Sequence, residues 1–174
     1  MASAAQAVTP VPSDFEEIVR EHQSMVFSIA YHFLHDRAAA EELAQDVFLQ
    51  LYKNLGGMES AGHVTRWLRK VTTNRCIDQC RRVKLMPKIG LDEVREPSCP
   101  AGQGDFLLSR ALRSLVASLP ENWRALVVLK YQEEMETEEI ARTLDLPVGT
   151  VKSQLSRALD FLREKATRVL GETV

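Results

Sequence analysis

Apolar residues in the last third of the chain recur at helical intervals on both sides of a short break. The first run places three of them on one side of a helix: Ile140, Ala141 and Leu144. Leu146 and Pro147 interrupt this run, and Gly149 opens a second one. The apolar stripe of the second run consists of Val151, Leu155, Ala158, Leu162 and Val169. Residues 137–168 therefore predict a short helix, a tight turn and a long helix.

The opposite face of the long helix carries hydrogen-bonding groups: Lys152, Ser153, Ser156, Arg157 and Asp160. A helix with a packed back, and with cations and hydroxyls near its start, suits the major groove of DNA. Thr150 or Gly149 can cap the free backbone N–H groups. The candidate contacts to duplex DNA are Thr150, Lys152, Ser153, Ser156 and Arg157. The alternative interpretation is an ordinary helical hairpin with a solvated polar face.

Further helices are predicted near the start of the chain. Residues 14–34 have helical apolar spacing without glycine or proline, which indicates one long helix or two joined ones. Asp36 then caps another helix, which ends at Gly56. The polar side of this helix contains Glu42, Gln45, Asp46 and Leu49. An apolar residue rimmed by polar groups indicates a protein-docking surface, although most charged helix faces are only solvated.

A basic helix is predicted after the glycine-rich loop of residues 56–65, because residues 61–90 hold one acidic and eight basic residues. Cations beside a loop, with an aromatic residue nearby, suit a DNA strand that has been opened. The candidate contacts to such a strand are Trp67, Lys70, Asn74, Arg75, Arg81 and Arg82. Trp67 also fits the hydrophobic core, since large aromatic side chains in amphipathic helices usually pack. Cys76 and Cys80 are expected to be buried thiols, because no second pair completes a metal site.

Composition divides the chain into two helical parts. Residues 1–13 are small, polar and proline-bearing, which is typical of a disordered arm. Residues 84–105 contain three prolines and three glycines, which predicts a flexible linker. The expected fold is all-α, with two small helical domains, residues 14–83 and 106–170, that have separate cores. The second domain contains the helix-turn-helix, and seven residues are expected to pack behind it: Leu112, Leu115, Leu119, Trp123, Leu126, Val127 and Leu129.

The net charge of −2 hides an uneven distribution. Residues 14–60 hold nine acids and three bases, whereas residues 146–170, like the basic helix, carry an excess of bases. Two basic blocks predict two contacts with a polyanion, and the acidic surface predicts a different partner. No apolar run approaches the roughly 20 residues that span a bilayer, so membrane insertion is not expected. Three cysteines without a regular framework favour a reducing, cytoplasmic compartment.

Catalytic and metal-binding patterns are missing from the sequence. It shows no glycine-rich phosphate loop and no nucleophile with a histidine partner, so no enzyme activity and no cofactor are predicted. His32 and His35 have a spacing that can hold a metal, but no further ligands complete a set of four. No metal site is therefore expected.

Three motifs, in this order, resemble those of the extracytoplasmic-function (ECF) sigma factors, promoter-recognition subunits of bacterial RNA polymerase. The polymerase-binding helix of the family is similar to AEELAQDVFLQLY. Its promoter-melting helix is similar to RWLRKVTTNRCIDQCRR, with Trp67, Asn74 and Asp78 at typical positions. Its second DNA-binding domain is similar to LPENWRALVVLKY followed by TEEIARTLDLPVGTVKSQLSRAL. The resemblance covers residues 14–83 and 106–168.

The resemblance implies an alternative sigma factor that binds core RNA polymerase and directs it to specific promoters. Glu42, Gln45 and Asp46 match positions that grip a coiled coil in the largest polymerase subunit. Residues 56–75 would capture the −10 element of the opened strand, and the long helix would read the −35 element. A separate anti-sigma protein is the expected regulator, because no sizeable domain follows residue 168. The alternative function is a helix-turn-helix repressor that acts without polymerase.

The sequence departs from the family pattern at several positions. Val64 stands where an aromatic residue is usual, so the pocket for a flipped base is expected to differ. Lys152 stands where arginine is common, and lysine does not make the forked contact of arginine to guanine. Further replacements are Cys80 for leucine, Glu134 and Thr137 for glycine and tyrosine, and Asp145 for the frequent glycine of the turn.

Overall fold

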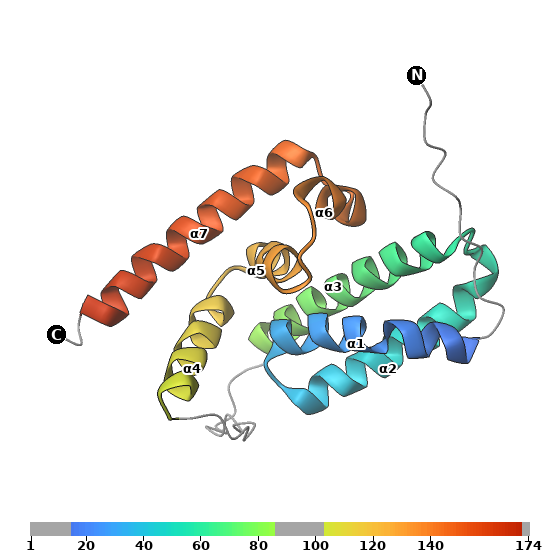
Figure 1. The fold of residues 1–174 in the computed structure, drawn as a ribbon, viewed down its shortest axis with the longest axis horizontal. Coiled ribbons are helices and arrows are strands. Elements are labelled where there is room, and N and C mark those ends of the chain that lie inside the picture. Colours follow the sequence, from blue (N-terminus) through green and yellow to red (C-terminus); the bar gives the residue numbers. More distant parts are fainter. Residues whose placement is uncertain (1–14, 86–102, 172–174) are drawn as a thin grey trace.

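The chain folds into two groups of helices that lie against each other (Figure 1). The computed structural model describes residues 15–85 and 103–171, with the side chains of residues 15–85 and 110–168. The predicted N-terminal arm and most of the predicted linker lie outside the described residues. Within the two described ranges every regular element is helical, which confirms the predicted all-α class.

The first group consists of α1 (Phe15–Leu34), α2 (Arg37–Asn54), the short 3₁₀ helix η1 (Leu55–Gly57) and α3 (Ala61–Leu85). α1 is one continuous helix. The carboxylate of Asp36 accepts a hydrogen bond from the N–H of Ala39 (2.9 Å), which confirms the predicted cap of α2. His35, one residue earlier, has a left-handed backbone with φ 56°, and the chain turns here from α1 into α2.

The second group consists of α4 (Gln103–Ala117), α5 (Glu121–Val127), the π-helical turn η2 (Val128–Gln132), α6 (Thr137–Leu144) and α7 (Val148–Gly171). α6 and α7 form the predicted helix-turn-helix. Asp145 has φ 55°, and the N–H of Leu146 donates to the carbonyl of Ala141 (2.9 Å), which closes the end of α6. Aspartate adopts this left-handed conformation more readily than most residues, so the turn forms without glycine.

Each group of helices buries its own apolar cluster. The first cluster includes Ile18, Val26, Phe33, Val47, Leu51 and Leu68, and the second includes Leu119, Leu126, Leu129, Met135, Ile140 and Val151. The two clusters meet at α5, because Ala125 belongs to the first cluster and Ile29 of α1 belongs to the second. The second group is therefore docked on the first along α1, α3 and α5 (Figure 1).

Several details differ from the sequence-based expectation. α3 begins at Ala61, within the predicted loop of residues 56–65, and continues to Leu85. α4 begins at Gln103, so helices extend into both ends of the predicted linker. Leu112 is 57% exposed and does not pack behind the helix-turn-helix, whereas Leu119, Leu126 and the other expected residues are buried or half-buried. Helical periodicity gives the direction of a side chain, but it does not tell whether another element reaches that direction.

Candidate nucleic-acid interface

The first turns of α7 present the candidate contacts to duplex DNA. Lys152, Ser153, Ser156 and Arg157 are exposed, whereas Val151, Leu155 and Ala158 are buried. α7 begins at Val148, so Thr150 lies within its first turn, half-buried, and its carbonyl accepts a hydrogen bond from the Ser153 hydroxyl (3.0 Å). The polar groups therefore project from one side of a helix whose other side is packed, as the DNA major groove requires.

Lys152 lies beside the first turn of α6, and its Nζ is 3.3 Å from Oε1 of Glu138. The pKa of Glu138 is lowered, first by a hydrogen bond from its own backbone N–H at the start of α6 and then by Lys152. Both side chains are more than half exposed. Because solvent screens such a pair, the contact with Glu138 holds Lys152 only weakly.

The candidate contacts to opened DNA lie along α3. Asn74, Arg81 and Arg82 are exposed, and Lys70 and Arg75 are half-buried. Trp67 is half-buried and packs against the first apolar cluster, as expected for an aromatic residue that supports the core. Lys70 forms an ion pair with Asp145, and Arg81 Nη2 donates to Asn122 Oδ1 (3.5 Å), so the second helix group covers part of this surface.

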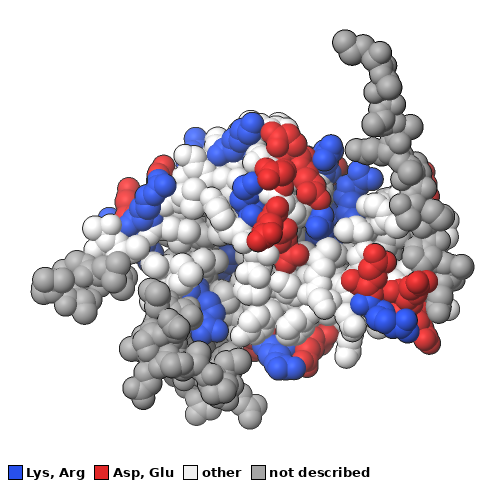
Figure 2. Space-filling view, in the orientation of Figure 1, with Lys and Arg blue, Asp and Glu red and all other residues white. Residues whose placement is uncertain are grey.

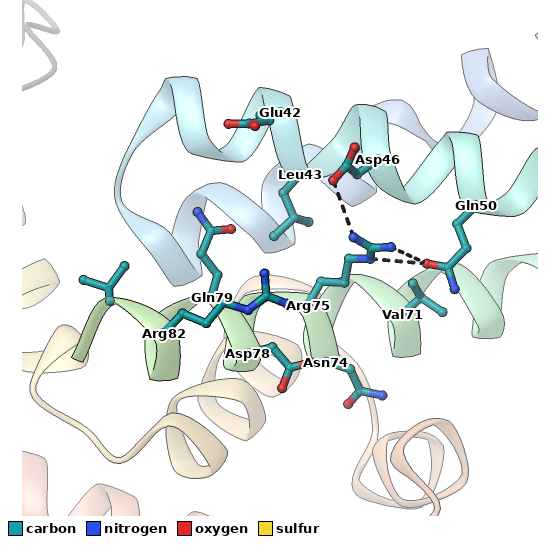
Figure 3. A pocket seen from close by; sticks show the side chains of 11 residues that line it. Glu42, Leu43, Asp46, Gln50, Val71, Asn74, Arg75, Asp78, Gln79 and Arg82 are labelled. Carbon is teal, nitrogen blue, oxygen red and sulfur yellow. Dashed lines mark hydrogen bonds and ion pairs between the residues drawn. The ribbon is translucent and has the colours of Figure 1, made fainter. Parts of the chain in front are cut away.

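A groove of about 670 Å³ lies along the surface between α2 and α3 (Figure 3). Arg75 reaches across it from α3: its Nη2 and Nε donate to Gln50 Oε1 (2.8 and 3.2 Å), and its Nη1 lies 3.4 Å from Asp46 Oδ2. Glu42, Asn74 and Arg82 also line the groove. The structure thus brings a candidate DNA contact, Arg75, next to a candidate polymerase contact, Asp46. Gln50 was not among the candidate residues predicted from the sequence. Its position one helical turn after Asp46 could have indicated that it lies on the same side of α2.

A second groove, of about 770 Å³, lies on the other side of α2, against α1. It is more apolar, and its lining includes Phe15, Val19, Phe27, Gln45, Phe48 and Leu49. Glu42, Gln45, Asp46 and Leu49 are all exposed along the edge of α2 between the two grooves, with Leu49 at 60%. We call this edge, defined by these four residues, the α2 ridge.

In the part of the chain that the structure describes, no group of three or more His, Cys, Asp or Glu residues could hold a metal ion. Cys76 is buried and Cys80 is half-buried, and burial raises the pKa of both thiols, which keeps them protonated. None of the helices in the described ranges is long and apolar enough to cross a membrane.

Comparison with known proteins assigns both helix groups. The model of Sigma-70 region 2 matches residues 18–85, and the model of Sigma-70, region 4 matches residues 109–162. The ECF RNA polymerase sigma factor SigE of Mycolicibacterium smegmatis is 30% identical over 178 residues, which cover 99% of this chain and 68% of SigE. The ECF RNA polymerase sigma factor SigW of Bacillus subtilis is 29% identical over 166 residues, which cover 87% of this chain and 88% of SigW.

A solved structure shares the arrangement of helices. The sigma factor RpoE of Bartonella quintana, crystallised with the anti-sigma factor NepR, matches with a TM-score of 0.69 and 21% identity, over 87% of this chain and 95% of that chain. The matched regions correspond to the two helix groups, in the order that the motifs indicated. The chain therefore belongs to the ECF class of the sigma-70 family, the alternative sigma factors that bind core RNA polymerase and direct it to specific promoters.

Proposed function

We propose that this sigma factor acts through three surfaces, carried by two domains, residues 14–83 and 106–170, and that it is not itself an enzyme. The α2 ridge binds core RNA polymerase. The outer side of α3 holds the opened −10 element, and the start of α7 reads the −35 element. The observation that carries the proposal is Leu49, a largely exposed leucine with polar neighbours between two grooves. An apolar centre with a polar rim is typical of a protein-binding surface.

The α2 ridge can be tested by replacing Gln45 and Asp46 together with alanine. We expect core polymerase to bind this variant about tenfold more weakly, because exposed polar contacts at an interface are lost while the packed side of α2 is unchanged. Binding is measured by titration of fluorescently labelled variant with core enzyme. The matched control replaces Gln132 and Glu136 together with alanine. These residues are an exposed amide and an exposed carboxylate on the second helix group. Equal affinities of the two double variants would refute the assignment.

The roles on α3 follow from exposure and chemistry. Lys70, Arg75, Arg81 and Arg82 hold phosphates of the opened strand, and Asn74, which is exposed on the groove, bonds to a base edge. Trp67 supports this surface from the core side. Arg75 holds phosphate only after it leaves Asp46, which lies on the α2 ridge. Polymerase binding at the ridge would therefore favour release of Arg75 toward DNA.

On α7 we assign base reading to Lys152 and Ser153 and phosphate binding to Arg157. The first two lie nearest the start of the helix, supported by Thr150, while Arg157 lies more than one turn further along. Ser156 is short and permits close approach. We expect Lys152→Ala to cost about 1 kcal/mol of −35 binding and to relax preference at one position. Arg157→Ala should weaken all −35 sequences alike, with a shallower salt dependence.

A library of −35 sequences, transcribed by each variant, measures these preferences. Asp160→Ala serves as the control, because Asp160 is exposed on the same helix and pairs with Arg163. A changed preference for the Arg157 variant, together with wild-type preference for the Lys152 and Ser153 variants, would show that the roles are reversed.

The partners follow from the same proposal. Core RNA polymerase and promoter DNA are the principal partners, and the site of action is the cytoplasm, where both are found. A separate anti-sigma protein regulates the chain, as NepR is the anti-sigma factor crystallised with the structurally similar RpoE. No cofactor or metal takes part.

A further inference from the structure

Arg75 is held across the groove between α2 and α3 mainly by a neutral group. Its Nη2 and Nε atoms donate to the amide oxygen of Gln50 at 2.8 and 3.2 Å, whereas its Nη1 atom lies 3.4 Å from Oδ2 of Asp46 (Figure 3). Asp46 and Gln50 are four residues apart on α2, so both lie on the same side of that helix. The shorter contacts of Arg75 are those to Gln50.

Other cations of α3 have charged partners. Three of them pair with carboxylates of the second helix group: Arg69 with Glu139, Lys70 with Asp145 and Lys84 with Glu121. Figure 2 shows acidic and basic side chains next to one another at several places on one face of the molecule. A carboxylate cancels the charge of its partner, whereas an amide oxygen accepts hydrogen bonds and leaves that charge in place. Gln50 itself therefore fixes the guanidinium of Arg75 without neutralising it.

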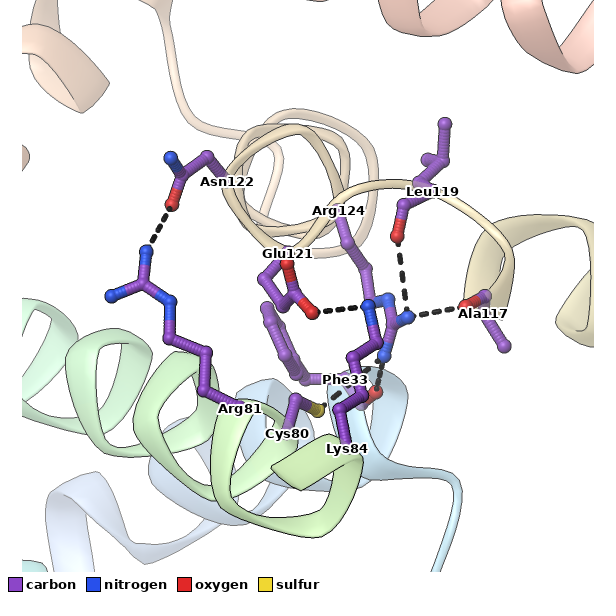
Figure 4. A network of polar contacts seen from close by, with 9 residues as sticks. All are labelled: Phe33, Cys80, Arg81, Lys84, Ala117, Leu119, Glu121, Asn122 and Arg124. Atoms are coloured by element: carbon purple, nitrogen blue, oxygen red, sulfur yellow. Dashed lines mark hydrogen bonds and ion pairs between the residues drawn. The ribbon is translucent and has the colours of Figure 1, made fainter. Parts of the chain in front are cut away.

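A second arginine of the chain is also held by neutral oxygens (Figure 4). Arg124 of α5 donates to the carbonyls of Ala117 and Leu119 in its own helix group and to the carbonyl of Phe33 in the other. Arg124 is only 6% exposed, so its charge is enclosed by the fold. The side chain of Arg75 is 41% exposed, so its charge can act on a ligand in the groove.

The contacts with Gln50 leave one edge of the Arg75 guanidinium for such a ligand. A guanidinium has five N–H groups, and Gln50 accepts from the edge formed by Nε and Nη2. The edge formed by Nη1 and Nη2 is a second fork, which suits two oxygens of a phosphate. Asp46 lies near this second edge, but the pair is long and both side chains are exposed, so solvent weakens it. A phosphate can thus replace Asp46 while Gln50 stays bound.

We propose that Gln50 is a positioning residue for the contact between Arg75 and the opened strand. It holds one edge of the guanidinium, keeps the charge of Arg75 intact and directs the other edge toward a phosphate. Gln50 is half-buried and lies outside the α2 ridge, and in this role it acts only through Arg75. The inference rests on the proposed strand-binding role of Arg75.

The test begins with Gln50→Met, which keeps the length of the side chain and removes the acceptor. The full chain is assembled with saturating core polymerase. The probe is a fluorescein-labelled promoter fragment that the wild-type holoenzyme transcribes, with its −10 region held open by mismatches. We expect anisotropy titration to show about fivefold weaker binding, the effect of one hydrogen bond to a partly exposed charged group. Gln132→Met, at an exposed glutamine of the second helix group, is the matched control and should bind like the wild type.

Gln50→Glu separates the position of Arg75 from its charge. Glutamate keeps the acceptor but neutralises the guanidinium, so the strand loses one charge contact. The slope of log affinity against log salt concentration should become shallower by about 0.7, the value for one phosphate of a single strand. A change that affects only packing does not alter this slope. An unchanged slope for Gln50→Glu would overturn the proposal.

The Arg75→Ala background decides whether Gln50 acts through Arg75. Gln50→Met should cause no further loss there, because no guanidinium remains to be held. A loss of the same size in both backgrounds would overturn the proposal. Equal or tighter binding by Gln50→Met alone would also overturn it, since Gln50 would then not help Arg75 to bind DNA.

The same variants distinguish the inference from the proposed function beneath it. If Arg75→Ala binds the probe like the wild type, the strand-binding role of Arg75 fails, and the inference about Gln50 fails with it. If Arg75→Ala weakens binding and Gln50→Met does not, the strand-binding role stands and only the positioning role of Gln50 is refuted.

Discussion

Replacement of Phe33 by alanine should lower the free energy of unfolding by about 3–5 kcal/mol, the usual cost of removing a buried phenyl ring. Phe33 is 0% exposed and packs within the first apolar cluster. The guanidinium of Arg124 lies over its ring, 5.2 Å from the ring centre. The change therefore leaves a cavity and also removes a favourable neighbour of a buried cation. Urea unfolding, followed by circular dichroism, measures the loss.

Tyr131→Ala is the control for this experiment, because Tyr131 is a large aromatic residue whose side chain is exposed. Its unfolding free energy should change by less than about 0.5 kcal/mol. A loss of similar size in both variants would contradict the assignment of Phe33 to the core and to the contact between the two helix groups.

Acidification should destabilise the fold through His35. Its pKa is lowered to about 4, first by burial and then by Arg124, Arg113 and His32. Neither ring nitrogen makes a hydrogen bond with the described residues, so nothing there compensates a proton. The unfolded chain binds this proton near pH 6.5, and the folded chain binds it only near pH 4. The contribution of neutral His35 to the free energy of unfolding is therefore intact above pH 6.5. It declines as the pH falls toward 4.

One pKa unit corresponds to about 1.4 kcal/mol, and the partial exposure of His35 reduces the effect, so we expect a loss of about 2 kcal/mol between pH 7 and pH 4. His35→Asn is the comparison, because asparagine accepts the left-handed backbone of this position but does not titrate. Urea unfolding of both proteins across this pH range separates the effect of His35 on stability from the effect of the carboxylates, which both proteins share. Parallel pH profiles would show that His35 makes no such contribution.

The helices and their exposed faces could be predicted from the sequence because their causes are local. The spacing of Val151, Leu155 and Ala158 gives the packed side of α7, and the polar side follows from the same period. The Asp36 cap and the helix-turn-helix were predicted for similar reasons. Each depends on residues that are within one or two turns of one another.

The contacts between distant elements could not be predicted in this way. Arg124 lies 91 residues from Phe33 and Glu139 lies 70 from Arg69, so no periodicity relates the partners. Arg124 reads as one charge within an otherwise amphipathic run, where a solvated cation is the ordinary expectation. Likewise, the sequence led to the prediction that Arg75 contacts DNA, but it did not indicate that Gln50 and Asp46 bind the Arg75 side chain. Such pairings depend on how whole helices dock.

The position of α5 restricts how this protein can diverge. All six residues from Arg124 to Leu129 are buried, because the end of α5 and the start of the π-helical turn pack against α1, α3, α6 and α7. Most helices have a solvent-facing side on which mutations accumulate with little effect on stability. This segment has no such side, and a bulkier side chain at any of its positions would strain a packed neighbour. Relatives that retain the docked arrangement must therefore change α5 and its surroundings together, whereas the exposed faces of α2 and α7 can change at little cost in stability.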